Sequence, residues 1–229
     1  MRAVLAVALL FAAVSAYATD PFIDRIGDSA NELKKANYEK ALKIEERLIK
    51  DMVPRLGPGD AETKWFSVLV AHKALALAGL GREDDALWYW HVALSIYPAI
   101  AESDMSMFGA PAEFLKTHPF QPPPTFTFTP TVPPPPLPSN VQPPKIVKRV
   151  EPLYPEGARA FRVSGIAIFA CVIDRNGSVR DVVMKKSLPA PTLSYMAMEA
   201  LRQWKFEPGT VDGKPVDVLF NLTVNYILR

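Results

Sequence analysis

The sequence has only one cysteine, Cys171, and only three histidines among its 229 residues. A single cysteine excludes an intramolecular disulfide, so the chain must be stabilised by packing. The histidines, His72, His91 and His118, have no metal-ligand spacing with one another or with the cysteine. We therefore predict that the protein binds no metal and no cofactor.

The net charge is also small, and catalytic motifs are lacking. The 26 basic and 24 acidic side chains leave a formal net charge of only +2, which is too small for the electrostatic footprint of a nucleic-acid-binding protein. Ser187 lacks a surrounding Gly-x-Ser-x-Gly elbow, and no phosphate-binding glycine loop occurs. We predict that the protein is not an enzyme and binds no nucleic acid.

One long uncharged run is present, in the N-terminal segment "MRAVLAVALLFAAVSAYATD". Arg2 supplies a positive charge, and Ala16 and Ala18 occupy the small-residue positions that signal peptidase needs. A membrane-spanning helix needs about 20 apolar residues, whereas the run over residues 3–18 has 16. We predict a signal peptide over residues 1–18; an uncleaved membrane anchor is the alternative.

Residues 19–119 have the pattern of a helical domain. The segment "SANELKKANYEKALKIEERLIKDM" has apolar residues at helical spacing, and Ser29 with Glu32 predicts a capping box at the helix start. The breakers in "RLGPGD" and "GLGRED" predict turns, with two more helices between and after them. A short closing helix is expected near residues 113–115.

The second and third of these helices resemble a tetratricopeptide repeat. Its marks are small residues where two helices cross, an aromatic residue on the second helix and a closing proline. The residues at those places are Ala74, Ala86, Trp90, Ala93 and Pro98. The resemblance implies a groove that binds a protein, without naming the ligand, and a generic helical hairpin is the alternative.

Residues 120–145 are predicted to be a linker. Eleven of the 25 residues from 121 to 145 are proline, which excludes helix and central strand because proline lacks an N–H and clashes. A polyproline-II spacer at about 3.1 Å per residue would reach roughly 75 Å. A PxxP ligand is the alternative.

Residues 146–229 alternate strand and helix patterns. "SGIAIFACVID" and "VRDVVMKKS" predict two strands, and Asn176 and Gly177 between them predict a type I′ hairpin turn with two positive φ angles. "PTLSYMAMEALRQWKF" predicts a helix, "EPGTVDGKP" a loop, and the alternation after it a last strand. We predict an α+β fold, in which this helix packs on a three-stranded antiparallel sheet.

The first of these strands is apolar on both faces. The residues expected to face the helix are Ala167, Phe169, Cys171 and Ile173. The residues of the opposite face are Ile166, Ile168, Ala170 and Val172. A solvated sheet face is normally polar, so we hypothesise that a second copy of the chain, the helical domain or the proline-rich segment covers this face.

The C-terminal block resembles the TonB C-terminal domain. The residues that carry the resemblance are Tyr154-Pro155, Gly165, Asp174, Gly177 and "LRQWKFEPG" at 201–209. The resemblance implies an energy transducer in the periplasm of a Gram-negative bacterium. Such proteins carry energy from a proton-driven inner-membrane motor to outer-membrane receptors that import siderophores and cobalamin.

The resemblance also implies a binding site. A TonB C-terminal domain grips a receptor segment, the TonB box, as an added strand, and a three-stranded sheet has open edges. We place this segment on the last strand, with Arg159, Phe161 and Arg162 as flanking contacts. The residues of the predicted edge are Val218, Leu219, Phe220, Asn221, Leu222, Thr223, Val224, Asn225 and Tyr226.

Two features depart from the family pattern. The family keeps an uncleaved anchor helix that contains a histidine, whereas this N-terminus is short and has none, and a helical domain stands where the family has linker. The alternative function is a soluble periplasmic adaptor without force transduction, whose two domains bind different envelope proteins. In a third interpretation, the C-terminal domain serves only to form a homodimer.

Overall fold

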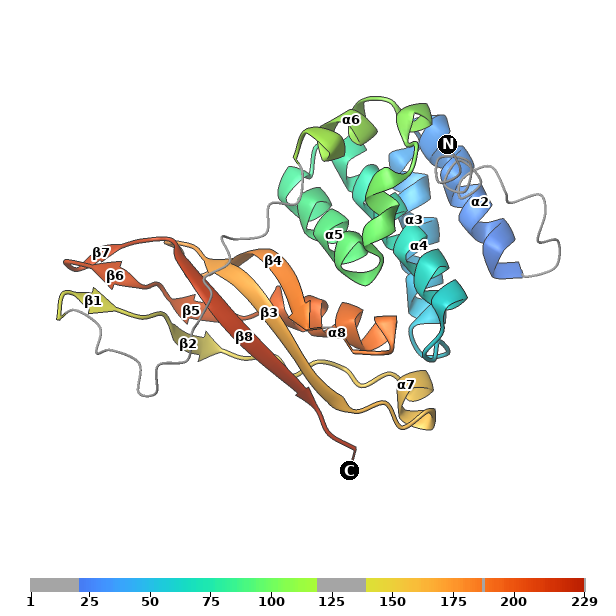
Figure 1. Ribbon diagram of the computed structural model, residues 1–229. Helices are drawn as coiled ribbons and strands as arrows, with labels where there is room; N and C mark the ends of the chain where they lie inside the picture. The colour runs from blue at the N-terminus through green and yellow to red at the C-terminus, as the bar shows by residue number, and fades with distance from the viewer. Residues whose placement is uncertain (1–20, 119–138, 187, 229) are drawn as a thin grey trace. The chain divides into compact units, whose positions relative to one another are not determined.

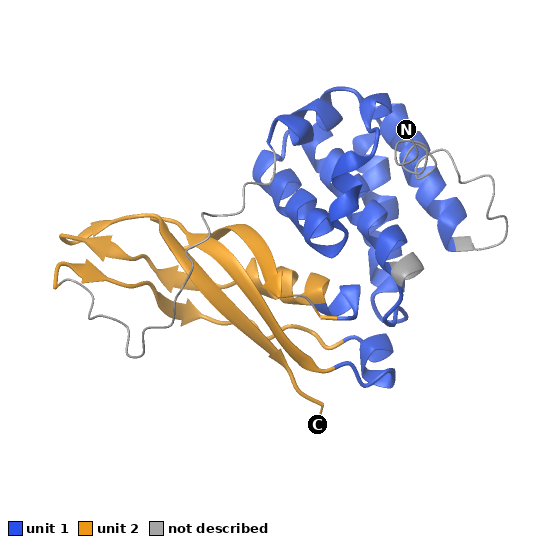
Figure 2. Cartoon of the chain, in the orientation of Figure 1, with its two compact units in different colours: residues 1–120, 155–163, 189–193 blue, residues 121–154, 164–188, 194–229 orange. Residues whose placement is uncertain are grey.

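A computed structural model describes residues 21–118, 139–186 and 188–228 of the chain (Figure 1). The chain is α+β, as the sequence predicts, and it divides into two compact units (Figure 2). The first unit comprises residues 1–120, 155–163 and 189–193, and the second comprises residues 121–154, 164–188 and 194–229.

The predicted signal peptide and most of the linker lie outside the described residues. This applies to residues 1–18, with Ala16 and Ala18 at the expected cleavage site, and to residues 119–138. Among the helices that the structure does describe, none combines the length and the apolar character needed to cross a bilayer. The domain boundaries expected at residues 19–119, 120–145 and 146–229 stay predictions.

Helices build the first unit. They are α2 (Pro21–Lys34), α3 (Tyr38–Met52), α4 (Asp60–Gly79), α5 (Glu83–Ile96), η2 (Pro98–Glu102), η3 (Ser106–Phe108), α6 (Ala110–Thr117) and α7 (Glu156–Ala160). The central helix is α4, which packs against α2, α3, α5 and α6. Its side chains Phe66, Leu69 and Leu75 are fully buried, because a helix surrounded by other helices is apolar on most of its surface.

The first predicted helix is in fact two helices. α2 ends at Lys34 and α3 begins at Tyr38, with Ala36 between them at a φ of 57°. Ser29 therefore lies inside α2, where it is fully buried, and it caps nothing. The capping-box prediction was wrong because a Ser-x-x-Glu pattern does not tell whether the serine faces the helix end or a neighbouring helix.

The second unit contains the expected antiparallel sheet, with strand order β4-β3-β8 (Figure 1). The strands are β3 (Gly165–Ile173), β4 (Val179–Lys186) and β8 (Val218–Tyr226), and α8 (Pro191–Leu201) follows β4. The predicted helix-facing residues of β3 each have an exposed fraction of 0%. Burial raises the pKa of the Cys171 thiol to about 12, so this cysteine is a small core residue.

The type I′ turn was predicted at the wrong position in the chain. Between β3 and β4 only Gly177 has a positive φ, of 74°, and the Oδ1 atom of Asp174 accepts the N–H groups of Asn176 and Ser178 instead. Two consecutive positive φ angles occur at Asp212 and Gly213, which are 51° and 75°. They connect two short strands in the segment that the sequence analysis assigned to a loop.

Five short strands were missed. β1 (Val141–Gln142), β6 (Thr210–Val211) and β7 (Lys214–Pro215) form one small sheet, and β2 (Lys145–Lys148) pairs with β5 (Lys205–Glu207). Strands of two to four residues carry too little alternation to be recognised in a sequence. They extend the second unit beyond the three long strands.

Gly177 and Gly213 provide a matched test of this turn geometry. Both have a positive φ, but a Cβ at Gly177 would collide with the backbone carbonyl of Phe206, whereas a Cβ at Gly213 meets no atom within 4 Å. We expect Gly213→Ala to cost about 1–2 kcal/mol of unfolding free energy for the left-handed conformation. Gly177→Ala should cost at least about 2 kcal/mol more, since the Phe206 backbone has to move.

The measurement is urea unfolding of both variants, followed by the amide NMR signals of β3. Equal losses of unfolding free energy in the two variants would show that the approach of Phe206 to Gly177 is unimportant for stability.

Candidate functional site

The long strand β8 forms one edge of the sheet. On one side it pairs with β3 without interruption, from Gly165 opposite Tyr226 to Ile173 opposite Val218. In the part of the chain that the structure describes, no strand pairs with its other side. At about 3.3 Å per residue, nine residues offer an edge of roughly 30 Å. Such an edge presents a row of backbone donors and acceptors to an extended segment.

The opposite edge of the same sheet, β4, is less suited to strand addition. Its pairing with β3 shifts register twice, and Asp181, in the irregularity opposite Ala170–Val172, has a φ of 51°. Its end carries the exposed Lys185 and Lys186. Bulges and lysines are the devices that protect a sheet edge from pairing, so of the two edges only β8 is regular and unprotected.

The side chains of β8 contain no charge. Asn221, Thr223 and Asn225 are exposed and alternate with the buried Leu222, Val224 and Tyr226, which confirms the predicted alternation in this half of the strand. Because no charged side chain or proline interrupts Val218–Tyr226, an added strand would meet neither repulsion nor a missing N–H along the edge.

A groove of about 530 Å³ lies where β8 ends. Its lining residues are Arg149, Glu151, Pro152, Tyr154, Asn225, Tyr226 and Ile227. The Tyr154 and Tyr226 rings meet edge to face with centroids 5.4 Å apart, and desolvation raises the pKa of the Tyr226 hydroxyl. The indole N–H of Trp204 donates to the Val150 carbonyl at 2.8 Å, so this wall of the groove is attached to the core.

The groove adds residues that the sequence analysis did not assign to the site. Arg149 is half-exposed; its Nε lies 2.9 Å from Glu151 Oε1 and its guanidinium 5.2 Å from the Trp204 ring centroid. The signal for this wall was the Tyr154-Pro155 pair, which the resemblance already used without placing it beside β8.

The three predicted flanking residues lie in and directly after α7. Arg159 lies in α7, and Phe161 and Arg162 follow it, so all three belong to the first unit whereas β8 belongs to the second. The exposed ring of Phe161 rests against Gly57 of the first unit, where an added Cβ would collide with it. The binding role of the nine residues of β8 and the flanking role of these three residues both stay predictions.

The outer face of β3 is only partly apolar. Ile168 lies opposite Thr223 on β8 and opposite Lys186 on β4, and Ile166 lies opposite Asn225. Ile166 remains 43% exposed, whereas Ala170 is 3% exposed. Because long lysine stems and polar neighbours share this face, the hypothesis that something covers it stays a prediction.

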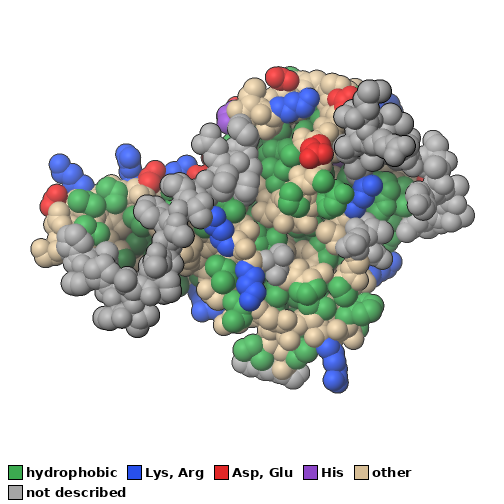
Figure 3. All heavy atoms as spheres, viewed as in Figure 1, with side chains coloured by type: hydrophobic (Ala, Val, Ile, Leu, Met, Phe, Trp, Pro, Cys, Tyr) green, Lys and Arg blue, Asp and Glu red, His purple; other side chains and the backbone are tan. Residues whose placement is uncertain are grey.

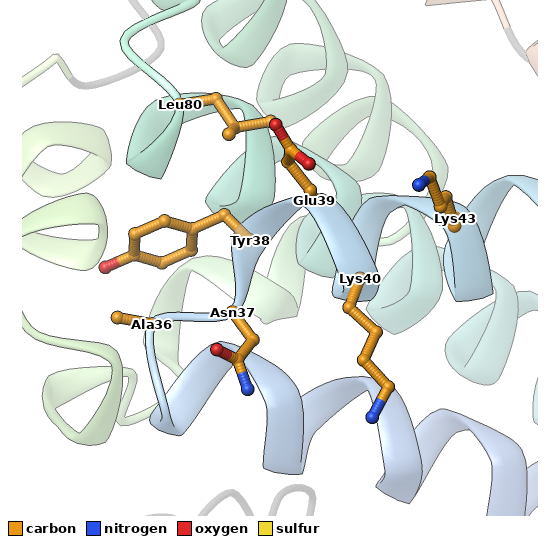
Figure 4. Close-up of a pocket in the computed structure, with 7 residues that line it drawn as sticks. All are labelled: Ala36, Asn37, Tyr38, Glu39, Lys40, Lys43 and Leu80. Carbon is orange, nitrogen blue, oxygen red and sulfur yellow. The ribbon is translucent and has the colours of Figure 1, made fainter.

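A second concave surface lies in the first unit, between the α2–α3 turn and the end of α4 (Figure 4). This pocket of about 480 Å³ is lined by Ala36, Asn37, Tyr38, Glu39, Lys40, Lys43 and Leu80. Asn37 donates to Glu32 at 2.8 Å, and the Lys40 Nζ lies 3.2 Å from the same carboxylate. These contacts hold the turn in place, and we assign the pocket no ligand.

Exposed side chains of both signs are scattered over the view in Figure 3. Among the described residues, no three His, Cys, Asp or Glu side chains gather as metal ligands. The small residues Ala74, Ala86 and Ala93 are fully buried where α4 and α5 pack. This packing fits the tetratricopeptide-like interpretation, which nonetheless stays a prediction.

Comparison with known proteins assigns the second half of the chain. The family described as "Gram-negative bacterial TonB protein C-terminal" matches residues 150–228. These residues form a TonB C-terminal domain. The resemblance inferred from the sequence is thereby confirmed, and β8 is the last strand of that domain.

Curated relatives also match part of the chain. Protein TonB of Xanthomonas campestris pv. campestris (strain B100) is 34% identical over 90 residues, which cover 39% of this chain and 37% of the relative. Protein TonB of Vibrio cholerae serotype O1 is 29% identical over 88 residues, covering 38% and 36%. Protein TonB of Escherichia coli (strain K12) is 30% identical over 80 residues, covering 34% of each. The chain thus spans little more than a third of the length of these relatives.

The outer face of the TonB C-terminal domain can be tested by charging it. If a second copy or another part of the chain covers β3, Ile168→Lys should lower the sedimentation coefficient or the melting temperature, because a covered lysine loses its hydration. Ile227→Lys is the control, since it adds the same charge at a side chain that is 70% exposed. Identical sedimentation and melting of the two variants would mean that the face is simply exposed.

Proposed function

We propose that this protein is a TonB-like periplasmic protein that binds segments of outer-membrane receptors by strand addition to β8, in energy-coupled transmembrane transport. The observation that carries this proposal is the regular, uncharged and unpaired edge of β8 within a TonB C-terminal domain. The role is one of binding and involves no catalysis.

Strand addition suits a protein that has to transmit force. A segment laid along β8 would make several backbone hydrogen bonds, each worth about 0.5–1.5 kcal/mol net. Tension along the strand axis loads these bonds together, so a weak reversible contact resists a pull before it separates. The side chains of Asn221, Thr223 and Asn225 would contact alternate residues of the segment and supply selectivity.

The other segments of the chain would determine where this domain can act. If the proline-rich segment forms the predicted polyproline-II spacer, it would let the binding domain act at a distance from the helical domain. We place the mature protein in the periplasm of a Gram-negative bacterium, and attachment through an uncleaved N-terminal segment to the inner membrane is the alternative.

A second function is favoured by the helical domain, which lies outside the residues that the TonB C-terminal family matches. In this alternative the protein is a soluble adaptor, whose C-terminal domain binds a strand of an envelope protein and whose helical domain binds another ligand. It would need a separate anchor to exert force on a receptor.

Backbone amide exchange tests the strand addition directly. Alternate amides of Val218–Tyr226 bond to β3, and the others face the open side. On addition of a TonB-box peptide, we expect the open-side amides to become protected from exchange by tenfold or more, with no change along the edge of β4. A peptide with proline at its central residue should protect far less, because it lacks a donor. Unchanged amides on β8 would rule out this edge as the binding site.

The two functions are separated by the state of the N-terminus. We expect intact-mass analysis of the protein from its own cell envelope to show a chain that begins at Thr19 in the periplasmic fraction. With that result, this protein could exert force on a receptor only if a separate anchor attached it to the inner membrane. A chain that retains Met1 in the inner-membrane fraction would contradict the predicted cleavage and favour an anchored transducer.

A further inference from the structure

The first unit contains a cluster of buried polar groups that the proposed function does not use. Ser29 of α2, Glu45 of α3 and His72 of α4 have exposed fractions of 0%, 0% and 1%. The Ser29 hydroxyl donates to Glu45 Oε1 at 2.7 Å and lies 3.4 Å from His72 Nδ1. These contacts join α2 to the two helices on which it packs.

Glu45 is poorly solvated as an anion. Among the described residues its Oε2 atom has no hydrogen-bond partner, and Oε1 accepts the hydrogen bond from Ser29. A buried carboxylate with so few donors costs several kcal/mol, and the usual response is to bind a proton. The geometry alone therefore favours a neutral carboxylic acid at this place.

The charged groups around the cluster do not reverse this preference. Lys73 of α4 attracts the carboxylate, but its own ammonium lies 3.9 Å from the centroid of the Tyr89 ring of α5. Glu46, the next residue of α3, repels it, and Lys34 of α2 acts on His72. On the remaining side, the Phe108 ring of η3 meets the imidazole edge to face at 5.7 Å.

The titration of the cluster follows from its burial. Desolvation raises the pKa of Glu45 from 4.5 to about 8, against the opposing effects of Ser29 and Lys73. Desolvation lowers the pKa of His72 from 6.5 to about 3. Both side chains are therefore neutral in the folded protein near pH 6.

The sign of the pH dependence is opposite for the two groups. The contribution of Glu45 to stability is complete below pH 4.5 and is lost as the pH rises towards 8, because the unfolded chain releases the proton first. The contribution of His72 is complete above pH 6.5 and is lost as the pH falls towards 3. The helical unit should therefore be most stable between about pH 4.5 and 6.5.

We propose that Glu45 is a proton-controlled latch, which holds α2 on α3 and α4 through Ser29 while its carboxyl is protonated and releases α2 when the proton is lost. α2 packs mainly on α3, with fewer contacts to α4 and η3. Release of this helix exposes the carboxylate to water while leaving the packing of α4 on α5 in place. A rise in pH would thus loosen one side of the helical unit.

The first experiment measures the proton itself in the full-length protein. The side-chain carboxyl carbon of Glu45 is assigned by NMR as the signal missing from Glu45→Gln, and its shift is followed with pH. We expect a midpoint near pH 8, well above the ordinary glutamate value of 4.5. A midpoint near pH 4.5 would overturn the proposal. Triple-resonance NMR can assign the same signal in wild-type protein, so the measurement does not depend on the folding of Glu45→Gln.

The second experiment measures the consequence for stability. In wild-type protein, the unfolding equilibrium constant of the helical unit should rise by up to about tenfold per pH unit between about pH 6.5 and 7.5, above the range in which the opposite effect of His72 cancels that of Glu45. Glu45→Gln keeps an acceptor for Ser29 and should remove this slope, whereas Glu46→Gln, an exposed change on the same helix, should retain it. The same slope in Glu45→Gln would refute the role of this carboxyl.

Hydrogen exchange distinguishes a latch from general loosening. After correction for intrinsic rates, the amides of α2 should lose protection between pH 6 and 8.5 by at least tenfold more than those of α4 and α5. Equal loss in all three helices would show that Glu45 controls the stability of the whole unit, and the latch would be disproved.

Discussion

The C-terminal domain depends on the pairing of its central strand. β3 pairs with a strand on each side and buries one face completely. Its backbone groups therefore find hydrogen-bond partners within the domain, and the apolar side chains of that face are shielded from water. β8 is held by the same pairing on one side alone, and it inherits a straight, regular conformation from nine consecutive pairs. A strand kept rigid by its neighbour and unpaired on its far side is a preformed template, because the entropy of ordering it has already been lost in folding.

The two units place unsatisfied polar groups in different positions. In the C-terminal domain they are backbone groups along an exposed edge, where water solvates them until a strand replaces it. In the helical unit they are side chains in the interior, where Glu45 has little solvation and binds a proton instead. The first arrangement favours a binding surface, and the second makes the packing of a helix depend on pH.

Particular residues show how far the sequence could be interpreted. Alternation along residues 218–226 and the apolar pattern of residues 165–173 predicted strands, faces and the burial of Cys171 correctly, because side-chain periodicity is a local property. The type I′ turn was expected at Asn176 and occurs at Asp212, because hydrogen bonds from Asp174 select a different turn after β3. Ser29 was interpreted as a helix cap, although its partner is 16 residues away in the chain.

The sequence by itself determined the α+β class, the sheet of three long strands with its helix, and the membership of residues 150–228 in the TonB C-terminal family. These features rest on local periodicity and on a motif of contiguous residues, both of which can be recognised without coordinates. Only the tertiary structure decided that β8 is a regular edge while β4 is bulged, that Arg149 and Tyr154 border its end, and that Glu45 meets Ser29. Each of these depends on contacts between residues distant in the chain, for which a single sequence contains no local signal.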